Sequence, residues 1–280
     1  MSAPALDDVT PRQVQIAQLR DRGYVVAPGF APAESLIKLN EAARVQLTAL
    51  ADPIEFEADL HYPGAPPSRT AAGGGTVRRL LGAYGRDLEF AAWATVPRLR
   101  EWLEAYFGEV ALMSRAHHNC LMTKHPRYGS ETRWHRDIRF WSFEREDLVS
   151  FWLALGEETI DNGALWFVPG SQRMAFDTDR FDDAKFFRAD RADNATILRT
   201  AVSPRLAPGD AVFFHCNTLH SAGRNLSDVV KFSLVYTYHG RSNAAQRGTR
   251  SASQAEVELQ AEVEPHARGQ SISGRRTDRK

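Results

Sequence analysis

Residues 134–137 read Trp-His-Arg-Asp, and the aromatic pair Phe140-Trp141 follows shortly after them. His135 and Asp137 are two positions apart, so in an extended strand both side chains point to the same face. Together with one more imidazole they would form a set of two histidines and one carboxylate. Such a set holds Fe(II) on one side and leaves the other coordination positions open. The stretch therefore predicts a metal site that is carried by β-strands.

The third ligand has to come from a distant strand, and two of the nine histidines are candidates. His220 and His215 both follow the apolar run 211–214. His220 is the preferred ligand, because Lys231 lies eleven residues after it, inside an otherwise apolar run. His215 is the alternative, either as the ligand or as a structural histidine beside the site.

Lys231 is unusual because a buried strand rarely contains a lysine unless its charge is paired. In a strand its side chain would share a face with that of Ser233, two residues on. A cation and a hydroxyl directed into a barrel would bind a small carboxylate. The alternative is an edge strand whose lysine reaches solvent.

The composition argues against several classes of protein. The chain has 280 residues, and 35 Lys+Arg balance 35 Asp+Glu, so neither nucleic-acid nor membrane binding is expected. No apolar run reaches the roughly 18 residues of a transmembrane helix, and the first ten residues lack the pattern of a signal peptide. Cys120 and Cys216 are too few for a disulfide framework, so we expect two buried thiols in a cytoplasmic protein. Nothing in the sequence indicates an oligomeric state.

The texture of the chain changes near residue 108. In the part at about 10–107, apolar residues recur with helical spacing. From about 110 to 240, short apolar runs alternate with Gly/Pro turns, which is typical of a sandwich or barrel. We therefore expect a mainly β fold with flanking α-helices, in the form of a cupin-like jelly roll. Residues 1–240 would form a single domain, and the polar residues 241–280 a solvated C-terminal extension.

The expected helices cover about 11–22, 32–50 and 97–107, and the expected strands cover 24–26, 111–113, 119–122, 148–155, 164–168, 211–214 and 230–238. Residues 51–76 interrupt this pattern, because Asp, Pro and Gly are dense there and Gly73-Gly74-Gly75 does not suit a helix or strand interior. A loop of this length is a lid or binding loop, or else a disordered insertion.

Four segments, in order, resemble one known family. Tyr24-Val25-Val26-Ala27-Pro28-Gly29 resembles its opening "GYVVLPG", Trp134-His135-Arg136-Asp137 resembles "WHQD", Asn162-Gly163-Ala164-Leu165 with Val168-Pro169-Gly170-Ser171-Gln172-Arg173 resembles "NGPL…VPGSHR", and His220-Ser221-Ala222-Gly223-Arg224-Asn225-Leu226-Ser227 resembles "HGSGPNRS". Over about residues 15–240 the chain thus resembles the phytanoyl-CoA dioxygenase (PhyH) family of Fe(II)- and 2-oxoglutarate-dependent oxygenases.

The resemblance implies a double-stranded β-helix and assigns the iron to His135, Asp137 and His220. It also implies that a basic residue eleven positions after the distal histidine binds the far carboxylate of 2-oxoglutarate. That residue is usually arginine, and here it is Lys231, with Ser233 beside it. A lysine pairs with a carboxylate but lacks the planar two-point fork of arginine.

Three further residues are expected near the cosubstrate. Lys124, eleven residues before His135, matches a family position that often contacts 2-oxoglutarate. Arg224 is a second basic candidate, in the loop after His220. Trp152 is either a wall of the cosubstrate pocket or an aromatic residue of the core.

The activity implied by the resemblance is hydroxylation of an unactivated C–H bond of a small molecule. Dioxygen and 2-oxoglutarate are consumed, and succinate and CO2 are released. Asp137 favours oxygen insertion, because related halogenases have Ala or Gly at that position.

The open face of the metal is expected to meet Arg139, Phe140 and Trp141, and Arg115, His117 and His118 lie on an earlier strand. Arg139 would suit an anionic substrate. The alternative is a surface arginine near a strand end.

Two other kinds of protein fit the same residues. One is a cupin-like metalloenzyme that does not use 2-oxoglutarate, which would need a fourth ligand such as His215 and no role for Lys231. The other is a non-catalytic barrel that retains the metal site.

Overall fold

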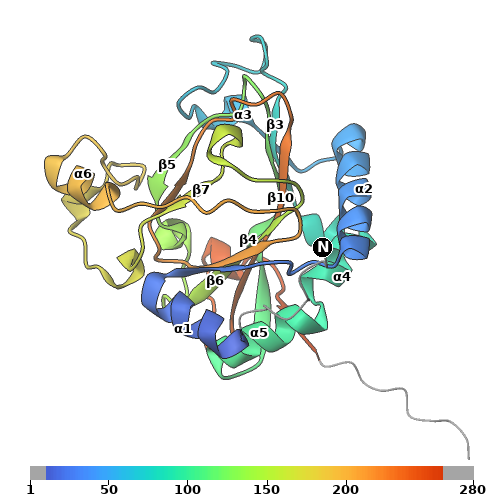
Figure 1. Ribbon diagram of the computed structural model, residues 1–280, viewed down its shortest axis with the longest axis vertical. Coiled ribbons are helices and arrows are strands. Elements are labelled where there is room, and N and C mark those ends of the chain that lie inside the picture. The colour runs from blue at the N-terminus through green and yellow to red at the C-terminus, as the bar shows by residue number, and fades with distance from the viewer. Residues whose placement is uncertain (1–10, 261–280) are drawn as a thin grey trace, which may run out of the picture.

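Two antiparallel sheets of unequal size carry the structure, a computed structural model that describes residues 11–260 (Figure 1). The larger sheet has eight strands in the order β1-β8-β6-β10-β4-β3-β2, with β11 paired to β4, and the smaller has the order β5-β9-β7. The strands of the larger sheet are β1 (Tyr24–Ala27), β2 (Ile54–Phe56), β3 (Val77–Leu81), β4 (Ala111–Lys124), β6 (Leu148–Ala154), β8 (Ala211–His215), β10 (Lys231–Gly240) and β11 (Val257–Glu258). Those of the smaller sheet are β5 (Thr132–His135), β7 (Leu165–Phe167) and β9 (His220–Ala222). The predicted fold class, mainly β with flanking helices, is confirmed.

Most helices lie on the side of the larger sheet, and α6 lies on the side of β5 and β7 (Figure 1). The α-helices are α1 (Arg12–Arg22), α2 (Ala33–Ala49), α3 (Glu57–Leu60), α4 (Leu88–Ala94), α5 (Pro97–Phe107) and α6 (Ala192–Leu198). Short 3-10 helices are η1 (Ala83–Gly85), η2 (Asp137–Phe140), η3 (Ile160–Asn162), η4 (Ser171–Arg173), η5 (Thr178–Arg180) and η6 (Arg250–Ala252). No helix among residues 11–260 is long and apolar enough to cross a bilayer.

Strand β6 of the larger sheet is buried on both faces, which explains why it is apolar at every position except Ser150. Phe151 and Leu153 pack toward the helices, where Phe213 stacks on Trp102 of α5 with ring centroids 3.8 Å apart. Trp152, between them, points to the opposite face and packs in the space between the two sheets. Because strand side chains alternate, one apolar strand supplies both cores.

The two short strands predicted at 111–113 and 119–122 are parts of one strand, β4. Its register with β10 jumps from the pair Asn119–Tyr236 to the pair Ser114–Thr237, so residues 115–118 have no partner in β10. A bulge of this kind redirects side chains, and it brings His117 and His118 to the site described below.

Residues 51–76 were predicted to be a lid or binding loop, or else a disordered insertion, and the second alternative is wrong. Glu55, Leu60 and Tyr62 of this segment line the pocket described below. The segment contains β2 and α3, and β2 pairs with β3. Strand β2 was not predicted because charged residues take the place of the apolar ones that mark a strand. Glu55 of β2 forms an ion pair with Arg79 of β3, at 2.6 Å. Gly73 has a positive φ of 75° and lies against Tyr128, and none of Gly73–Gly75 lines the pocket.

The prediction of a solvated extension after residue 240 is wrong up to residue 260. Asn243, Ser251 and Leu259 are buried, and β11 adds to the edge of β4. The Asn243 amide donates to the backbone carbonyls of Arg145 and Asp147, at 3.0 and 3.1 Å. Residues 261–280 lie outside the part of the chain that the structure describes.

Candidate active site

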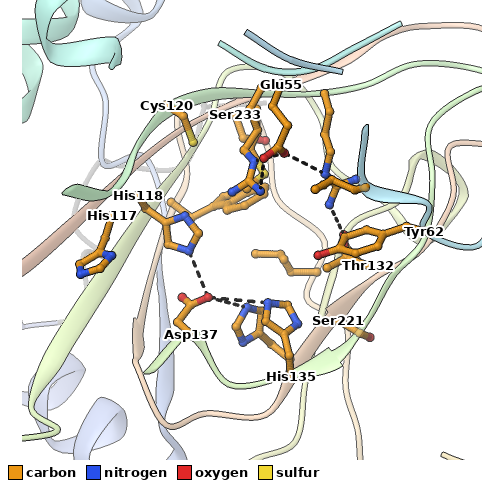
Figure 2. Close-up of a pocket in the computed structure, with 18 of the residues that line it drawn as sticks. Glu55, Tyr62, His117, His118, Cys120, Thr132, His135, Asp137, Ser221 and Ser233 are labelled. Atoms are coloured by element: carbon orange, nitrogen blue, oxygen red, sulfur yellow. Dashed lines mark hydrogen bonds and ion pairs between the residues drawn. The ribbon is translucent and has the colours of Figure 1, made fainter. Parts of the chain in front are cut away.

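The smaller sheet brings the three predicted metal ligands together. His135 is the last residue of β5, Asp137 opens η2, and His220 is the first residue of β9, where it is the direct cross-strand partner of His135. One ligand atom from each residue lies within 4.8 Å of the others, and all three residues are buried. Figure 2 shows His135 and His118 converging on the Asp137 carboxylate. His215 is not part of this group, because it is held near Asp147 and does not line the pocket.

Both imidazoles of the group are oriented by backbone carbonyls. His135 Nδ1 lies 2.8 Å from the Arg133 carbonyl oxygen, and His220 Nδ1 lies 3.0 Å from that of Thr218. A carbonyl only accepts hydrogen bonds, so each Nδ1 carries the hydrogen and each Nε2 presents a lone pair. Burial lowers the pKa of His135 well below its ordinary value and also lowers that of His220. Both rings are therefore neutral near pH 7, the form that binds metal.

Asp137 is ionised and held from two sides. Ser150 Oγ of β6 donates to Asp137 Oδ2 at 2.8 Å, and His118 Nε2 lies 3.0 Å from Oδ1. Burial alone would raise the pKa of Asp137, but His118 and His220 lower it well below its ordinary value. Two neutral imidazoles and one carboxylate on one face are the donor set that suits Fe(II), so the residues present fit that ion.

A pocket of about 330 Å³ opens onto this group. Arg139, Phe140 and Trp141, which the sequence placed near the substrate, all line it, as do His117 and His118. Arg115 does not line it, because its guanidinium lies over the Tyr84 ring instead. The volume suits a small molecule.

Lys231 and Ser233 line the same pocket but are already paired. Lys231 lies in β10, a central strand between β6 and β4, so the alternative of a solvent-reaching edge lysine is wrong. Its ammonium binds Glu158 Oε2 at 2.8 Å, and Ser233 Oγ donates to Glu158 Oε1 at 2.6 Å. Trp152 Nε1 donates to the same Oε1 at 2.8 Å, which makes Trp152 a pocket wall as well as a core residue.

The two other basic residues expected near the cosubstrate differ. Lys124 lines the pocket, but its ammonium donates to the backbone carbonyls of Ser130, Ala222 and Gly223. All three N–H groups are thus engaged, and a contact with the cosubstrate is not supported. The role predicted for Arg224 is wrong, because the side chain is exposed, donates to the Arg127 carbonyl and does not line the pocket.

Several charged residues of the pocket were not anticipated. Arg78 and Arg79 of β3 line one wall, where Glu55 and the fully buried Glu57 neutralise them. Arg250, from the segment predicted to be a solvated tail, lines another part. The adjacent Arg78 and Arg79 are visible in the sequence, but which way their side chains point depends on strand β3, which was not predicted. The role of Glu158 could not be predicted from the sequence, because its partners Lys231 and Ser233 are distant in the chain and only the fold brings them together.

Comparisons with known proteins agree with this geometry. The family model of phytanoyl-CoA dioxygenase (PhyH) matches residues 19–233. The ectoine dioxygenase of Sphingopyxis alaskensis is 24% identical over 249 residues, which cover 83% of this chain and 77% of that protein. The probable alpha-ketoglutarate-dependent hypophosphite dioxygenase of Stutzerimonas stutzeri is 24% identical over 234 residues, which cover 78% and 75% of the two proteins.

Solved structures share the fold. EctD from S. alaskensis, solved with 2-oxoglutarate and 5-hydroxyectoine, has a TM-score of 0.70 at 22% identity, covering 87% of this chain and 81% of that chain. The non-haem alpha-ketoglutarate-dependent epimerase SnoN from nogalamycin biosynthesis has a TM-score of 0.68 at 23% identity, covering 84% and 85%. The family match includes all four motifs and every strand from β1 to β9, and so the resemblance is confirmed: this chain belongs to the phytanoyl-CoA dioxygenase (PhyH) family.

Proposed function

We propose that this protein is an Fe(II)- and 2-oxoglutarate-dependent dioxygenase that hydroxylates a small molecule. The observation that carries the proposal is the ligand group of His135, Asp137 and His220, which opens onto a pocket that Lys231 and Ser233 also line. When bound, Fe(II) and 2-oxoglutarate supply the oxidation of an unactivated C–H bond by dioxygen, with release of succinate and CO2.

The chain's own residues hold and orient the reactants. The Nε2 atoms of His135 and His220 and the Asp137 carboxylate would hold the ion, because their outer hydrogen bonds keep them in the binding form. The remaining N–H groups of Lys231 would receive the far carboxylate of 2-oxoglutarate, next to Ser233, whose hydroxyl hydrogen is donated to Glu158.

The proposed substrate is a small anion. Arg139 and Arg250 line the pocket, and among residues 11–260 neither forms an ion pair. The other two guanidiniums of the pocket, those of Arg78 and Arg79, are neutralised by glutamates. Arg139 stands over the Phe186 ring at 4.2 Å and donates to the Ala184 carbonyl at 3.5 Å, so it is held in place by uncharged groups. Two guanidiniums that line the pocket without an ion pair favour a carboxylate or phosphate on the substrate.

The first test of the function is anaerobic. Fe(II) and then 2-oxoglutarate are added to the protein, and the weak visible absorption band of the iron–2-oxo acid chelate is recorded. The band is expected in the wild type and in His125→Ala, a histidine outside the pocket, and is expected to disappear in His135→Ala. In air, succinate release with a substrate then separates an enzyme from a non-catalytic barrel. Iron binding without the band would contradict the use of 2-oxoglutarate.

The substrate class is tested with a panel of small acids and matched neutral compounds, scored by succinate release. Turnover is expected to depend on the anionic group, and Arg139→Gln and Arg250→Gln are expected to raise KM. Arg173→Gln, which removes an exposed guanidinium paired with Asp21, is the control. Preferred turnover of neutral compounds, insensitive to Arg139 and Arg250, would exclude an anionic substrate.

A cupin-like enzyme that does not use 2-oxoglutarate is the second candidate, and one observation favours it. His118 Nε2 lies 3.0 Å from Asp137 Oδ1, so a third imidazole stands beside the ligand group and would be a fourth ligand. Burial disfavours its charged form, but Asp137 raises the pKa of His118 to about 9, so the ring would have to lose a proton before it binds metal. The earlier candidate for this ligand, His215, is wrong, because it does not line the pocket. The chelate band decides between the two functions.

The proposed location is the cytoplasm, which the two free buried cysteines support.

A further inference from the structure

We infer that Glu158 is a built-in counter-ion of the cosubstrate subsite, which weakens the binding of 2-oxoglutarate and reduces selectivity for its far carboxylate. The inference rests on the proposed function, because it concerns the same subsite. It makes Glu158 a residue that determines specificity, although it would touch neither the metal nor the reacting atoms.

Glu158 is fully buried, and both of its carboxylate oxygens are engaged. Oε2 receives the ammonium of Lys231, and Oε1 receives both the Ser233 hydroxyl and the Trp152 indole N–H. Lys231 and Ser233 are the side chains that the family resemblance assigns to the far carboxylate of 2-oxoglutarate, and Trp152 is a wall of the same pocket. The carboxylate of Glu158 therefore already makes the contacts that the cosubstrate would seek.

The backbone holds Glu158 in this position. Its N–H donates to the Leu206 carbonyl at 2.9 Å, and the Leu206 N–H donates back to the Glu158 carbonyl at 3.0 Å. The side chain enters from the turn that follows β6 and lies behind Lys231, Ser233 and Trp152. Those three residues line the pocket, whereas Glu158 does not.

A cosubstrate carboxylate that approaches Lys231 from the pocket thus meets a neutral pair rather than an isolated cation. Glu158 is the only hydrogen-bond partner of the Lys231 ammonium among residues 11–260, so its other N–H groups remain to receive a ligand. The attraction of the lysine is offset by repulsion from the glutamate just behind it. In a buried site the negative charge of Glu158, a few ångströms behind the Lys231 ammonium, cancels much of the favourable energy between that ammonium and the cosubstrate carboxylate.

Neighbouring cations do not replace Lys231 in this part of the pocket. The Arg79 guanidinium is bound to both oxygens of Glu55, at 2.6 and 2.9 Å. The Lys124 ammonium is occupied by backbone carbonyls. The chain should therefore distinguish poorly between 2-oxoglutarate and a 2-oxo acid of equal length that ends in a methyl group.

The test uses 2-oxoglutarate and 2-oxopentanoate, which share the keto acid end and chain length but differ in the far carboxylate. Their Kd values are measured by calorimetry on full-length protein loaded with Mn(II). We expect the wild type to prefer 2-oxoglutarate by less than about tenfold, and Glu158→Gln to widen that preference by about tenfold or more. Glutamine removes the charge and keeps the shape of the side chain, but it has one acceptor oxygen instead of two, so its NH2 group faces either Lys231 or the donors of Ser233 and Trp152. Glu157→Gln, at the adjacent exposed position paired with Arg205, is the matched control and should match the wild type.

Three results would overturn the inference. One is a preference of Glu158→Gln for 2-oxoglutarate over 2-oxopentanoate that is no wider than that of the wild type. A narrower preference would mean that Glu158 positions Lys231 for the ligand. Another is a wild-type preference above about 100-fold, the range of an unopposed charge-assisted hydrogen bond; this measurement decides even if the variant does not fold. The third is equal widening in Glu157→Gln. If neither 2-oxoglutarate nor 2-oxopentanoate binds to the Mn(II)-loaded wild type or to any variant, the proposed function itself is wrong.

Discussion

Ser150→Ala tests whether the hydrogen bond behind Asp137 supports metal binding. Ser150 Oγ donates to Asp137 Oδ2 at 2.8 Å, and neither residue is more than 5% exposed. Removing the hydroxyl leaves that carboxylate oxygen without its donor and lets the carboxylate rotate. Loss of such an outer partner typically lowers metal affinity by about 10- to 100-fold, which corresponds to about 1.4 to 2.8 kcal/mol.

The assay is a titration with Mn(II) in which the unbound ion is followed by electron paramagnetic resonance. Ser114→Ala is the matched control, because Ser114 is equally buried in β4, on the other side of β10, and its Oγ has no hydrogen-bond partner among residues 11–260. Circular dichroism and Tm show whether both variants are folded. Wild-type affinity in Ser150→Ala, or an equal loss in Ser114→Ala, would refute the reasoning.

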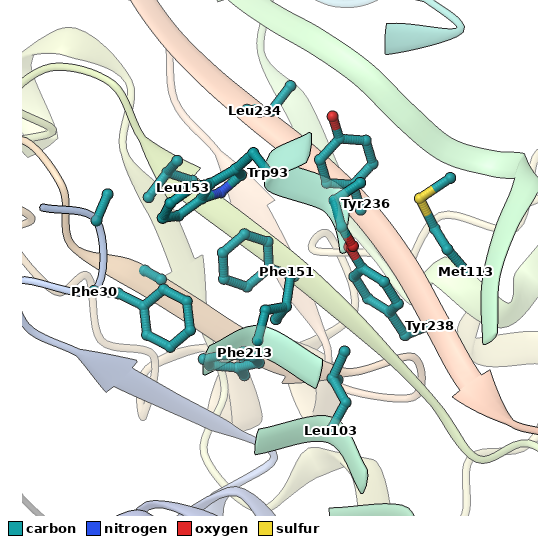
Figure 3. Packing of buried hydrophobic residues seen from close by; sticks show 14 of the residues in the cluster. Phe30, Trp93, Leu103, Met113, Phe151, Leu153, Phe213, Leu234, Tyr236 and Tyr238 are labelled. Carbon is teal, nitrogen blue, oxygen red and sulfur yellow. The ribbon is translucent and has the colours of Figure 1, made fainter. Parts of the chain in front are cut away.

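Two further predictions concern stability. Phe213→Ala should lower the free energy of unfolding by about 3 to 5 kcal/mol, because the ring stacks on Trp102 and packs against Phe151 at the centre of the core in Figure 3. Urea unfolding measures this loss. A loss under about 1 kcal/mol, which is typical of a surface substitution, would contradict this packing. Burial lowers the pKa of His215, whose Nδ1 accepts the Asn217 N–H at 3.1 Å, so the folded state keeps that ring neutral. Its contribution to stability is present above the ordinary pKa of 6.5 and is lost as pH falls toward the lowered value. Urea unfolding with a metal chelator at pH 7.5 and 5.5 should show a smaller decrease in His215→Gln than in the wild type, and an equal decrease would contradict the assignment.

Features that depend on spacing within one strand could be read from the sequence. The pairs His135 and Asp137, and Lys231 and Ser233, each share a face because side chains alternate along an extended chain. The apolar run at 148–155 likewise predicted a strand, and the structure shows that this strand, β6, is buried at every position. Strands β2 and β3 escaped detection because paired charges, those of Glu55 and Arg79, replaced the apolar residues that mark a strand.

The sequence by itself determined the family, the mainly β architecture and the candidate metal ligands, because each follows from short motifs whose geometry is local. Only the tertiary structure decided which histidine completes the ligand group, since the pairing of β5 with β9 places His220, and not His215, opposite His135. It also decided that the charge of Lys231 is balanced by Glu158, which lies 73 positions away. The reason is physical: direction along a strand is set by neighbouring residues, whereas charge compensation in a buried site depends on which distant segments the sheets bring into contact.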